Sequence, residues 1–329
     1  MNAGWGAEEF VNRGFHENGD QTITLDFRKH RYNLVHKFLS LSGDFDALLL
    51  QRGDNFPIPL LRATSVPKIF WATELVSRNR DQDRNFRSGG FDFAFLRTPQ
   101  CIDAVVNNKW MPRDRLGVML SGFDPAVQKK QPGVVKDIDV LFVGSILPRR
   151  RRWLDYLKNK GVNLTEAKAF GPRMTDLVNR ARIVLNIHAE DYTDTETRVF
   201  EVLGCGAFLI SETLSAENPF TPGLHYVEVA TVDEMYSAIE SYLKNDRTPI
   251  AEAGYREALE KHTYRHRALQ FREQFQTLID RIPARVGLPV IDKVQVRRYR
   301  VIEVLKSVGS VFPATFFRLK ALLKKILRK

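Results

Sequence analysis

The chain has 329 residues, a hydrophobic fraction of 43% and a formal net charge of +11 at pH 7. This length and hydrophobic content predict one large or two medium-sized folded domains and exclude a disordered chain. Two cysteines, Cys101 and Cys205, exclude a disulfide-rich scaffold and favour a reducing compartment. The first six residues show no apolar signal region, and no apolar run reaches the roughly 18–20 residues of a membrane span.

The first part of the chain, residues 1–125, predicts an α/β domain. Short apolar runs typical of buried parallel strands occupy 22–27, 46–51, 68–73 and 93–97, with helical stretches at 7–17, 31–41 and 99–108. The helix at 7–17 comes before any strand, whereas a doubly wound domain opens with a strand that lies in the middle of its sheet. Loss of that strand would leave buried backbone groups unpaired. We interpret the domain as lacking its first strand through a shortened start, with a rearranged sheet as the alternative.

A polar segment containing Pro and Gly at 124–137 predicts a linker. The alternation then resumes, with strands expected at 140–143, 183–187 and 207–210 and helices at 149–160, 195–203 and 232–243. We predict a second α/β domain at 126–285 and a tail at 286–329. A last helix that crosses back to the first domain is left open.

The strand that ends at residue 143 runs into Gly144 and Ser145, and four arginines at 149–152 open the next helix. Arginines at the positive end of a helix dipole are locally unfavourable, and a bound diphosphate would remove the conflict. Arg149 and Arg150 are therefore candidate anion ligands. A solvated basic turn is the alternative, since the segment lacks the full dinucleotide-binding fingerprint.

Asn186 and His188 stand at the end of the next strand. Ligand crevices of open parallel sheets lie at the carboxyl ends of strands, so both residues are candidates for a site. The alternative for His188 is a buried structural histidine.

The segment 193–206 predicts a helix with a capping box formed by Thr193 and Glu196. Arg198 and Glu201 lie three residues apart on one face of it. They are either an ordinary surface pair or part of a phosphate site at the helix start, with the carboxylate accepting ribose hydroxyls. Gly206 follows the predicted helix end.

These segments, in this order and spacing, resemble the nucleotide-binding half of GT-B glycosyltransferases, in particular the group related to spore-maturation glycosyltransferases. The matching stretches are 143–145, 182–188, 198–201, 204–210, 222–225 and 260–264. The first half matches more loosely, at 25–28, 70–74 and 92–98. The resemblance implies an α/β fold with two Rossmann-like domains facing a cleft, and an enzyme that transfers a sugar from a nucleoside-diphosphate sugar to a glycan, lipid-linked or protein acceptor.

The resemblance also implies roles for individual residues. The donor nucleotide is expected to bind at Gly144, Ser145, Arg149, Arg150, Asn186, Glu201 and Gly206, with Glu201 at the ribose. Arg198 is expected near the phosphates or against Glu201, and His188 near the donor sugar. The acceptor is expected to enter past Gly4, Trp5 and Gly6. An inverting reaction needs a base, for which Glu74 is the first candidate and His188 the second.

One position departs from the family pattern. Many retaining relatives carry two glutamates eight positions apart, and Thr193 stands where the first is expected. The stereochemical outcome is therefore open. GT-B enzymes stabilise the leaving diphosphate with arginine, lysine and helix dipoles, so the resemblance implies no metal and no cofactor. The metal-binding DxD pattern is matched only superficially at Asp137 and Asp139, because the pair precedes a strand.

The positive charge is concentrated at the carboxyl end. Residues 293–329 contain eleven Lys and Arg and one Glu, a net +10 that leaves +1 for residues 1–292. A nearly neutral body argues against a nucleic-acid partner. Two short helices are predicted at 301–312 and 314–329, and the second is amphipathic and basic, typical of a membrane-surface element.

This tail predicts a cytoplasmic protein that is peripheral on the inner face of a membrane, held to anionic lipid through residues 297–329. Packing of the tail on the body, or on a second copy in a homodimer, is the alternative. A catalytically silent GT-B module that binds nucleotide or a partner protein is the alternative function.

Overall fold

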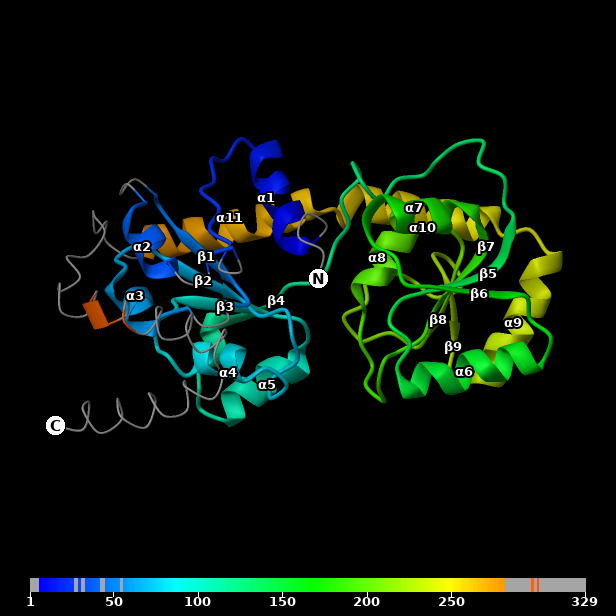
Figure 1. Ribbon diagram of the computed structural model, residues 1–329, viewed down its shortest axis with the longest axis horizontal. Coiled ribbons are helices and arrows are strands. Elements are labelled where there is room, and N and C mark those ends of the chain that lie inside the picture. The colour runs from blue at the N-terminus through cyan, green and yellow to red at the C-terminus, as the bar shows by residue number, and fades with distance from the viewer. Residues whose placement is uncertain are drawn as a thin grey trace. The chain divides into compact units, whose positions relative to one another are not determined.

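The structure is a computed structural model. It describes residues 6–26, 29–30, 33–41, 45–53, 56–281, 297–298 and 301. The chain divides into two compact units, one formed by residues 1–22 and 119–272 and the other by residues 23–118 and 273–329. Each unit contains one parallel β-sheet (Figure 1). Apart from residues 297, 298 and 301, the predicted basic tail lies outside the described residues.

The unit of residues 23–118 contains a four-stranded sheet with the strand order β1-β2-β3-β4, in which all neighbours are parallel. Its strands are β1 (Leu48–Gln51), β2 (Lys68–Trp71), β3 (Phe93–Leu96) and β4 (Leu116–Val118). Its helices are α2 (Leu34–Leu39), α3 (Ile58–Ala63), α4 (Arg80–Phe86) and α5 (Pro99–Asn107). Phe70 of β2 is fully buried, with ring centroids of Phe86 and Phe91 at 5.1 and 5.0 Å, so an aromatic cluster forms the centre of this core.

Three of the predicted strands are confirmed as β1, β2 and β3, whereas the strand expected at 22–27 is wrong over its described residues, 22–26. The hydroxyl of Thr22 instead bonds the side chains of Asn12 and His16, which ties the start of this segment to the preceding helix. The spatial order of the described strands is the same as their order in the chain: β1 lies at one edge of the sheet, and each strand pairs with the next. The gap expected in the middle of the sheet does not occur between them.

The other unit contains a five-stranded parallel sheet with the order β6-β5-β7-β8-β9. Its strands are β5 (Ile138–Val143), β6 (Leu164–Ala167), β7 (Ala181–Asn186), β8 (Leu209–Glu212) and β9 (Val227–Val229). Its helices are α6 (Pro148–Asn159), α7 (Gly171–Arg180), α8 (Thr197–Gly204), α9 (Val232–Lys244), α10 (Thr248–Lys261) and α11 (Tyr264–Arg281). The last part of α11, from residue 273, belongs to the unit that contains the four-stranded sheet. The predicted strands and helices of this region are confirmed, but β6 and α7 were missed because β6, Leu-Thr-Glu-Ala, is half polar.

Both faces of the five-stranded sheet are covered. Val140 and Phe142 of β5 belong to a core shared with α6 and α9, whereas Leu141 and Val143 belong to a core shared with α7, α8 and α10 (Figure 1). Side chains alternate along a strand, so a strand covered on both faces reads as a continuous apolar run. The layers are therefore helix, sheet and helix.

The paths of two adjacent strands define where a ligand site is expected. β5 leads into α6 on one face, and its neighbour β7 leads into α8 on the other face. In open α/β sheets the crevice between two such strands, at their carboxyl ends, is the ligand-binding position. Gly144 and Ser145 follow β5 at this position, and Ile187 and His188 follow β7.

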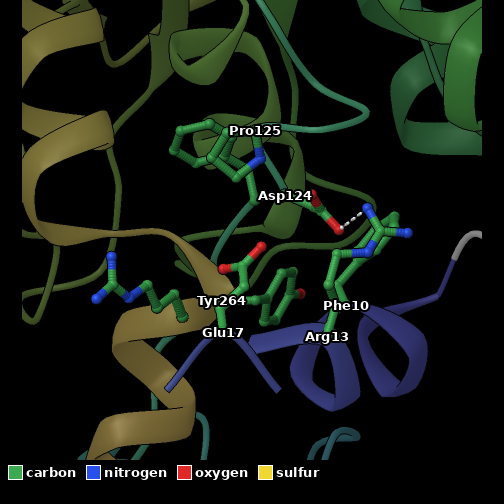
Figure 2. A pocket seen from close by; sticks show the side chains of 8 residues that line it. Phe10, Arg13, Glu17, Asp124, Pro125 and Tyr264 are labelled. Atoms are coloured by element: carbon green, nitrogen blue, oxygen red, sulfur yellow. Dashed lines mark ion pairs between the residues drawn. The ribbon is translucent and has the colours of Figure 1, made fainter. Parts of the chain in front are cut away.

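The first helix, α1 (Ala7–Glu17), is part of the five-stranded unit and not of the domain 1–125 to which we assigned it. Arg13 forms an ion pair with Asp124 at 2.7 Å, and the rings of Phe10 and Tyr264 lie 5.7 Å apart (Figure 2). A Cβ on Gly14 would lie 2.5 Å from the carbonyl oxygen of Tyr264, so only glycine permits this approach. These contacts surround a cavity of about 10 Å³. They also place the predicted linker, residues 124–137, inside this unit.

Candidate functional site

Arg150 lies in the crevice between β5 and β7. Its Nε donates to the carbonyl of Ile187 at 2.7 Å, and its Nη1 donates to the carbonyl of Ser145 at 3.1 Å. Its Nη2 donates to both carboxylate oxygens of Glu196 at 3.0 Å. The side chain is 12% exposed. Arg150 therefore joins the loops that follow the two strands, and the cation that we expected at a diphosphate is paired with a protein carboxylate.

Arg149, the preceding residue of α6, points to different partners. Its Nη1 donates to Glu212 at 2.8 Å and to the carbonyl of His188 at 3.0 Å, and its Nη2 donates to the other oxygen of Glu212. Its Nε donates to Asp191 at 2.7 Å. The hydrogen bonds that Arg149 donates to Glu212 raise its pKa, burial lowers it, and the hydrogen bond that Arg149 donates to Asp191 raises it further, so that the pKa lies above its ordinary value. Every nitrogen of this guanidinium thus has a partner.

His188 is held by two hydrogen bonds, one from its backbone and one from its ring. Its backbone N–H donates to Glu212 at 2.5 Å, and its Nε2 lies 2.8 Å from the carbonyl oxygen of Thr213, which makes Nε2 the protonated nitrogen. Its buried Nδ1 lies 4.0 Å from Glu196, too far for a hydrogen bond. Burial lowers the pKa of His188, but Glu196, the Thr213 carbonyl and Glu212 together raise it above its ordinary value. The imidazole is therefore oriented, and a carboxylate favours its charged form.

Arg198 and Glu201 form an ion pair at 2.9 Å on the first turns of α8, and each side chain is 15% exposed. Burial raises the pKa of Glu201, and the charge of Arg198 opposes that shift. Gln128 also donates to Glu201 at 3.4 Å. The structure thus supports the predicted contact between Arg198 and Glu201, which holds a carboxylate next to the start of a helix.

One expectation about α8, the capping box at its start, is wrong. The helix begins at Thr197 with Glu196 as its N-cap residue, and no capping box with Thr193 forms, because the Glu196 carboxylate is bonded to Arg150. Gly206 follows the far end of the helix, with φ +66°. Eight residues of helix, about 12 Å at 1.5 Å per residue, separate it from the start of α8. Gly206 therefore terminates the helix, and its role at the donor stays a prediction.

Asn186 and Gly144 have backbone and cross-strand partners. Nδ2 of Asn186 donates to the Ser211 hydroxyl at 3.0 Å, which joins the ends of β7 and β8. Asn186 is 2% exposed, so in this structure it orders the sheet edge. The N–H of Gly144 donates to the carbonyl of Ala167 at 2.9 Å and extends the pairing of β5 with β6.

The other predicted residues are distributed differently. Glu74 belongs to the four-stranded unit, just after β2, with its side chain 3.8 Å from Arg52 and its backbone bonded to Gln82. Its role as a base stays a prediction. Gly6 is the N-cap residue of α1 and so belongs to the five-stranded unit, not to the acceptor-side domain. Gly4 and Trp5 lie outside the described residues.

A pocket of about 200 Å³ opens beside His188, at the carboxyl ends of β7, β8 and β9. It is lined by Arg149, His188, Glu190, Asp191, Tyr192, Thr193, Glu212, Thr213 and Ala230. Sequence reasoning missed Glu212 as a site residue, and it considered Glu196 only for a capping box. The rule that selected Asn186 at the end of β7 also applies to Glu212, the last residue of β8, and would have found it.

No group of three or more His, Cys, Asp and Glu side chains that could hold a metal ion occurs in the part of the chain that the structure describes. Asp137 and Asp139, which superficially match a metal-binding pattern, pair with Arg180 and Arg182 at the start of β5. Within the described residues, no helix has the length and apolar character needed to cross a membrane.

Residues 124–273 match a family described as Glycosyl transferase-like. Solved structures with a similar fold include the pneumococcal O-GlcNAc transferase GtfA in complex with UDP and GlcNAc, with a TM-score of 0.54 and 12% identity. The chain has a GT-B fold. The match with GtfA covers 76% of this chain but only 60% of that enzyme. No curated protein matches the chain by sequence.

The same GT-B fold occurs in Anabaena HepE in complex with UDP, with a TM-score of 0.53, 14% identity and coverage of 74% of this chain and 82% of HepE. Sucrose-phosphate synthase from Thermosynechococcus elongatus matches with a TM-score of 0.55, 11% identity and coverage of 79% and 82%. The resemblance and the fold class that the sequence predicts are confirmed. The family match covers the segment that contains Arg149, Arg150, His188, Glu201 and Glu212.

Proposed function

We propose that this protein is a glycosyltransferase that moves a sugar from a nucleoside-diphosphate sugar to a glycan, lipid-linked or protein acceptor without a metal ion. The observation that carries the proposal is the charged network of Arg150, Glu196 and His188 at the crevice between β5 and β7. This network lies within the residues that match the glycosyl transferase-like family. Its position agrees with the general place of ligands in such sheets.

The proposed chemistry follows from charge. When the bond between the sugar and the diphosphate breaks, negative charge builds up on the leaving diphosphate. Arg150 and Arg198, together with the amino-terminal end of α8, would stabilise that charge. Binding requires Arg150 to exchange the carboxylate of Glu196 for a phosphate, a bidentate partner of similar geometry. Glu201 would accept hydrogen bonds from hydroxyls of the ribose.

The acceptor hydroxyl must lose a proton in an inverting reaction. Glu74 and His188 are the two candidate bases. In the described structure Nδ1 of His188 is the nitrogen available for a proton, since Nε2 donates to Thr213. Thr193 in place of a first glutamate leaves the retaining and inverting outcomes both open.

We propose UDP-sugars as the first donors to test, because GtfA and HepE are described in complex with UDP. We further propose that the basic segment 297–329 brings the protein to the inner face of an anionic membrane, where an acceptor for cell-surface polysaccharide would be found. Binding to vesicles with and without anionic lipid tests this part. Sedimentation of the full chain distinguishes a monomer from a homodimer.

The test of the site is Glu201→Ala, assayed by release of nucleoside diphosphate from the donor. We expect no detectable transfer. Because the alanine leaves Arg198 without its partner, Glu201→Gln is a second variant, and we expect it to lose at least about tenfold in activity through loss of a charged acceptor. Glu240→Gln on the exposed side of α9 is the control and should retain full activity. Full activity of a correctly folded Glu201→Ala would exclude this site.

A second candidate is a catalytically silent module that binds nucleotide or a partner protein. Two observations favour it: Thr193 replaces a glutamate, and both Arg149 and Arg150 are paired with protein carboxylates. Release of nucleoside diphosphate from a sugar nucleotide by the wild-type protein would eliminate this candidate.

A further inference from the structure

We propose that the pocket beside His188 receives the sugar of the donor and selects an uncharged or amino sugar over one that carries a carboxylate. The inference rests on the proposed function, since it takes the donor to be a nucleotide sugar bound at this sheet edge. It goes beyond that function by naming the class of sugar.

The size of the pocket suits one sugar ring. Its volume of about 200 Å³ lies below the range of about 300–1,000 Å³ that is usual for whole drug-sized ligands. The pocket adjoins the crevice, because the consecutive residues Arg149 and Arg150 donate to the carbonyls of His188 and Ile187, which are themselves consecutive after β7. Arg150 bonds Glu196 in the crevice, and Arg149 bonds Glu212 at the pocket. A sugar in the pocket and a diphosphate at Arg150 would therefore be neighbours.

The charge of the lining disfavours an anion. Three carboxylates line the pocket, those of Glu190, Asp191 and Glu212, against the guanidinium of Arg149. Even with His188 protonated, the lining keeps an excess of negative charge. A like charge placed beside such a lining is repelled, so a sugar that carries a carboxylate should bind less tightly than an uncharged one.

The cation in the lining is already engaged. All three nitrogens of Arg149 donate to protein oxygens, two of them to Glu212, whose side chain is 6% exposed. A carboxylate on the sugar would have to displace one of these partners. Asp191 is the partner that can be displaced, because its side chain is 86% exposed and makes a single bond to Nε.

Sugar hydroxyls, by contrast, suit this lining. They donate hydrogen bonds, and carboxylate oxygens accept them strongly. An amino group on the sugar would add a charge-assisted bond. The side chain of Thr193 lies in the same lining, so the position where relatives carry a glutamate supplies a hydroxyl here.

The experiment compares UDP-glucose with UDP-glucuronate, which differ only at C6, by calorimetric binding and by release of UDP. If no UDP-sugar binds, GDP-mannose and GDP-mannuronate form the equivalent pair. For the wild-type protein we expect the uncharged donor to bind at least about tenfold more tightly, as like-charge juxtaposition predicts. Asp191→Asn removes one negative charge from the lining and replaces the charged acceptor of the Arg149 Nε hydrogen bond by a neutral one. It should reduce that preference by about threefold or more, mainly by improving the uronate. Glu240→Gln makes the same change of charge on α9, away from the lining, and should leave the preference unchanged.

The outcomes separate the inference from the function on which it rests. Equal binding of the two donors, or tighter binding of the uronate, overturns the inference and leaves the glycosyltransferase proposal in place. A wild-type preference that Asp191→Asn leaves unchanged also overturns it, because the selection then arises elsewhere. If no nucleotide sugar of either base binds or is cleaved, the proposed function fails and the inference fails with it.

Discussion

Two interior strands of the four-stranded sheet and two of the five-stranded sheet end in buried side chains of opposite polarity. In the four-stranded sheet, β2 ends at Trp71 and β3 at Leu96, which are 4% and 1% exposed. In the five-stranded sheet, β7 ends at Asn186 and β8 at Glu212, which are 2% and 4% exposed. The burial is equal and the polarity is reversed. A buried carboxylate or amide is costly unless it is paired, so the second sheet needs a network of partners that the first does not.

Apolar and polar strand ends are stabilised in different ways. Apolar strand ends are satisfied by contact alone, as in the aromatic cluster around Phe70. Polar strand ends require donors from other loops, and here they bring Arg149 and the backbone of His188 to Glu212. Under the proposed function, donors at this edge of the sheet would also recognise the substrate. The sheet with paired charges at its carboxyl edge is therefore the one that carries the candidate site.

The largest expected effect tests the packing side of this comparison. Phe70→Ala removes a fully buried ring from the four-stranded sheet and should lower the free energy of unfolding by about 3–5 kcal/mol. Because the donor network belongs to the other unit, nucleotide affinity should stay within about twofold of wild type where the variant is folded. Denaturant unfolding and calorimetry measure the two quantities. A large loss of nucleotide affinity with an intact fold would show that the two sheets do not divide the roles in this way.

The next effect tests the chemical side. Arg150→Ala removes the guanidinium from the crevice, and activity should fall by about 100-fold or more, the usual result of removing a group that stabilises transition-state charge. Arg151→Ala, one residue further along α6, is the matched control, because Arg151 pairs with Glu166 and Asp155. Steady-state rates of diphosphate release compare the two variants. Equal losses in both would assign the effect to helix α6 as a whole.

A smaller effect distinguishes two histidines of the five-stranded unit by pH. His262 lies against Phe200 and Phe220 and accepts a hydrogen bond from Arg267 at 3.0 Å. Burial, and then the charge of Arg267, lower the pKa of His262 to about 4. The unfolded chain takes up a proton near pH 6.5, whereas the folded protein does so only near pH 4. His262 therefore supports the folded state fully above about pH 6.5, and this contribution, about 3 kcal/mol, is lost as the pH falls toward 4.

The measurement is urea unfolding of wild type and His262→Gln between pH 4.5 and pH 7.5, and the variant should lose most of the slope. His188 has the opposite sign, because its pKa is raised: its contribution is complete below about pH 6.5 and declines as the pH rises through the folded-state pKa. Identical pH profiles of wild type and His262→Gln would contradict the assignment.

In the five-stranded unit, sequence patterns predicted the strands and helices better than they predicted the contacts between residues. The runs at 140–143, 183–187 and 207–210 were identified because strands buried on both faces lack polar residues. The sequence analysis did not predict β6, because Thr165 and Glu166 interrupt its apolar character. The strand expected at 22–27 has the right composition, but the bonds of Thr22 to α1 take its first residue elsewhere.

For the site residues too, the sequence predicted positions at strand ends better than the contacts between them. Gly144, Asn186 and His188 were found because a strand end is visible in the sequence. Glu212 ends a strand too, but its importance depends on Arg149, which is 63 positions away. The pairing of Arg150 with Glu196 spans 46 positions. Because of this pairing, the Glu196 carboxylate, which the sequence assigned to a capping box, lies in the crevice instead.

By itself, the sequence determined the alternation of strands and helices, the parallel character of both sheets and the strand ends at which a ligand is expected. These properties depend on apolar periodicity over a few neighbouring residues. Only the tertiary structure decided that α1 packs on the five-stranded unit, that both arginines are paired and that Glu212 holds His188 in place. Such contacts depend on the order of strands in a sheet and on the face that each helix covers, which bring together residues far apart in the chain.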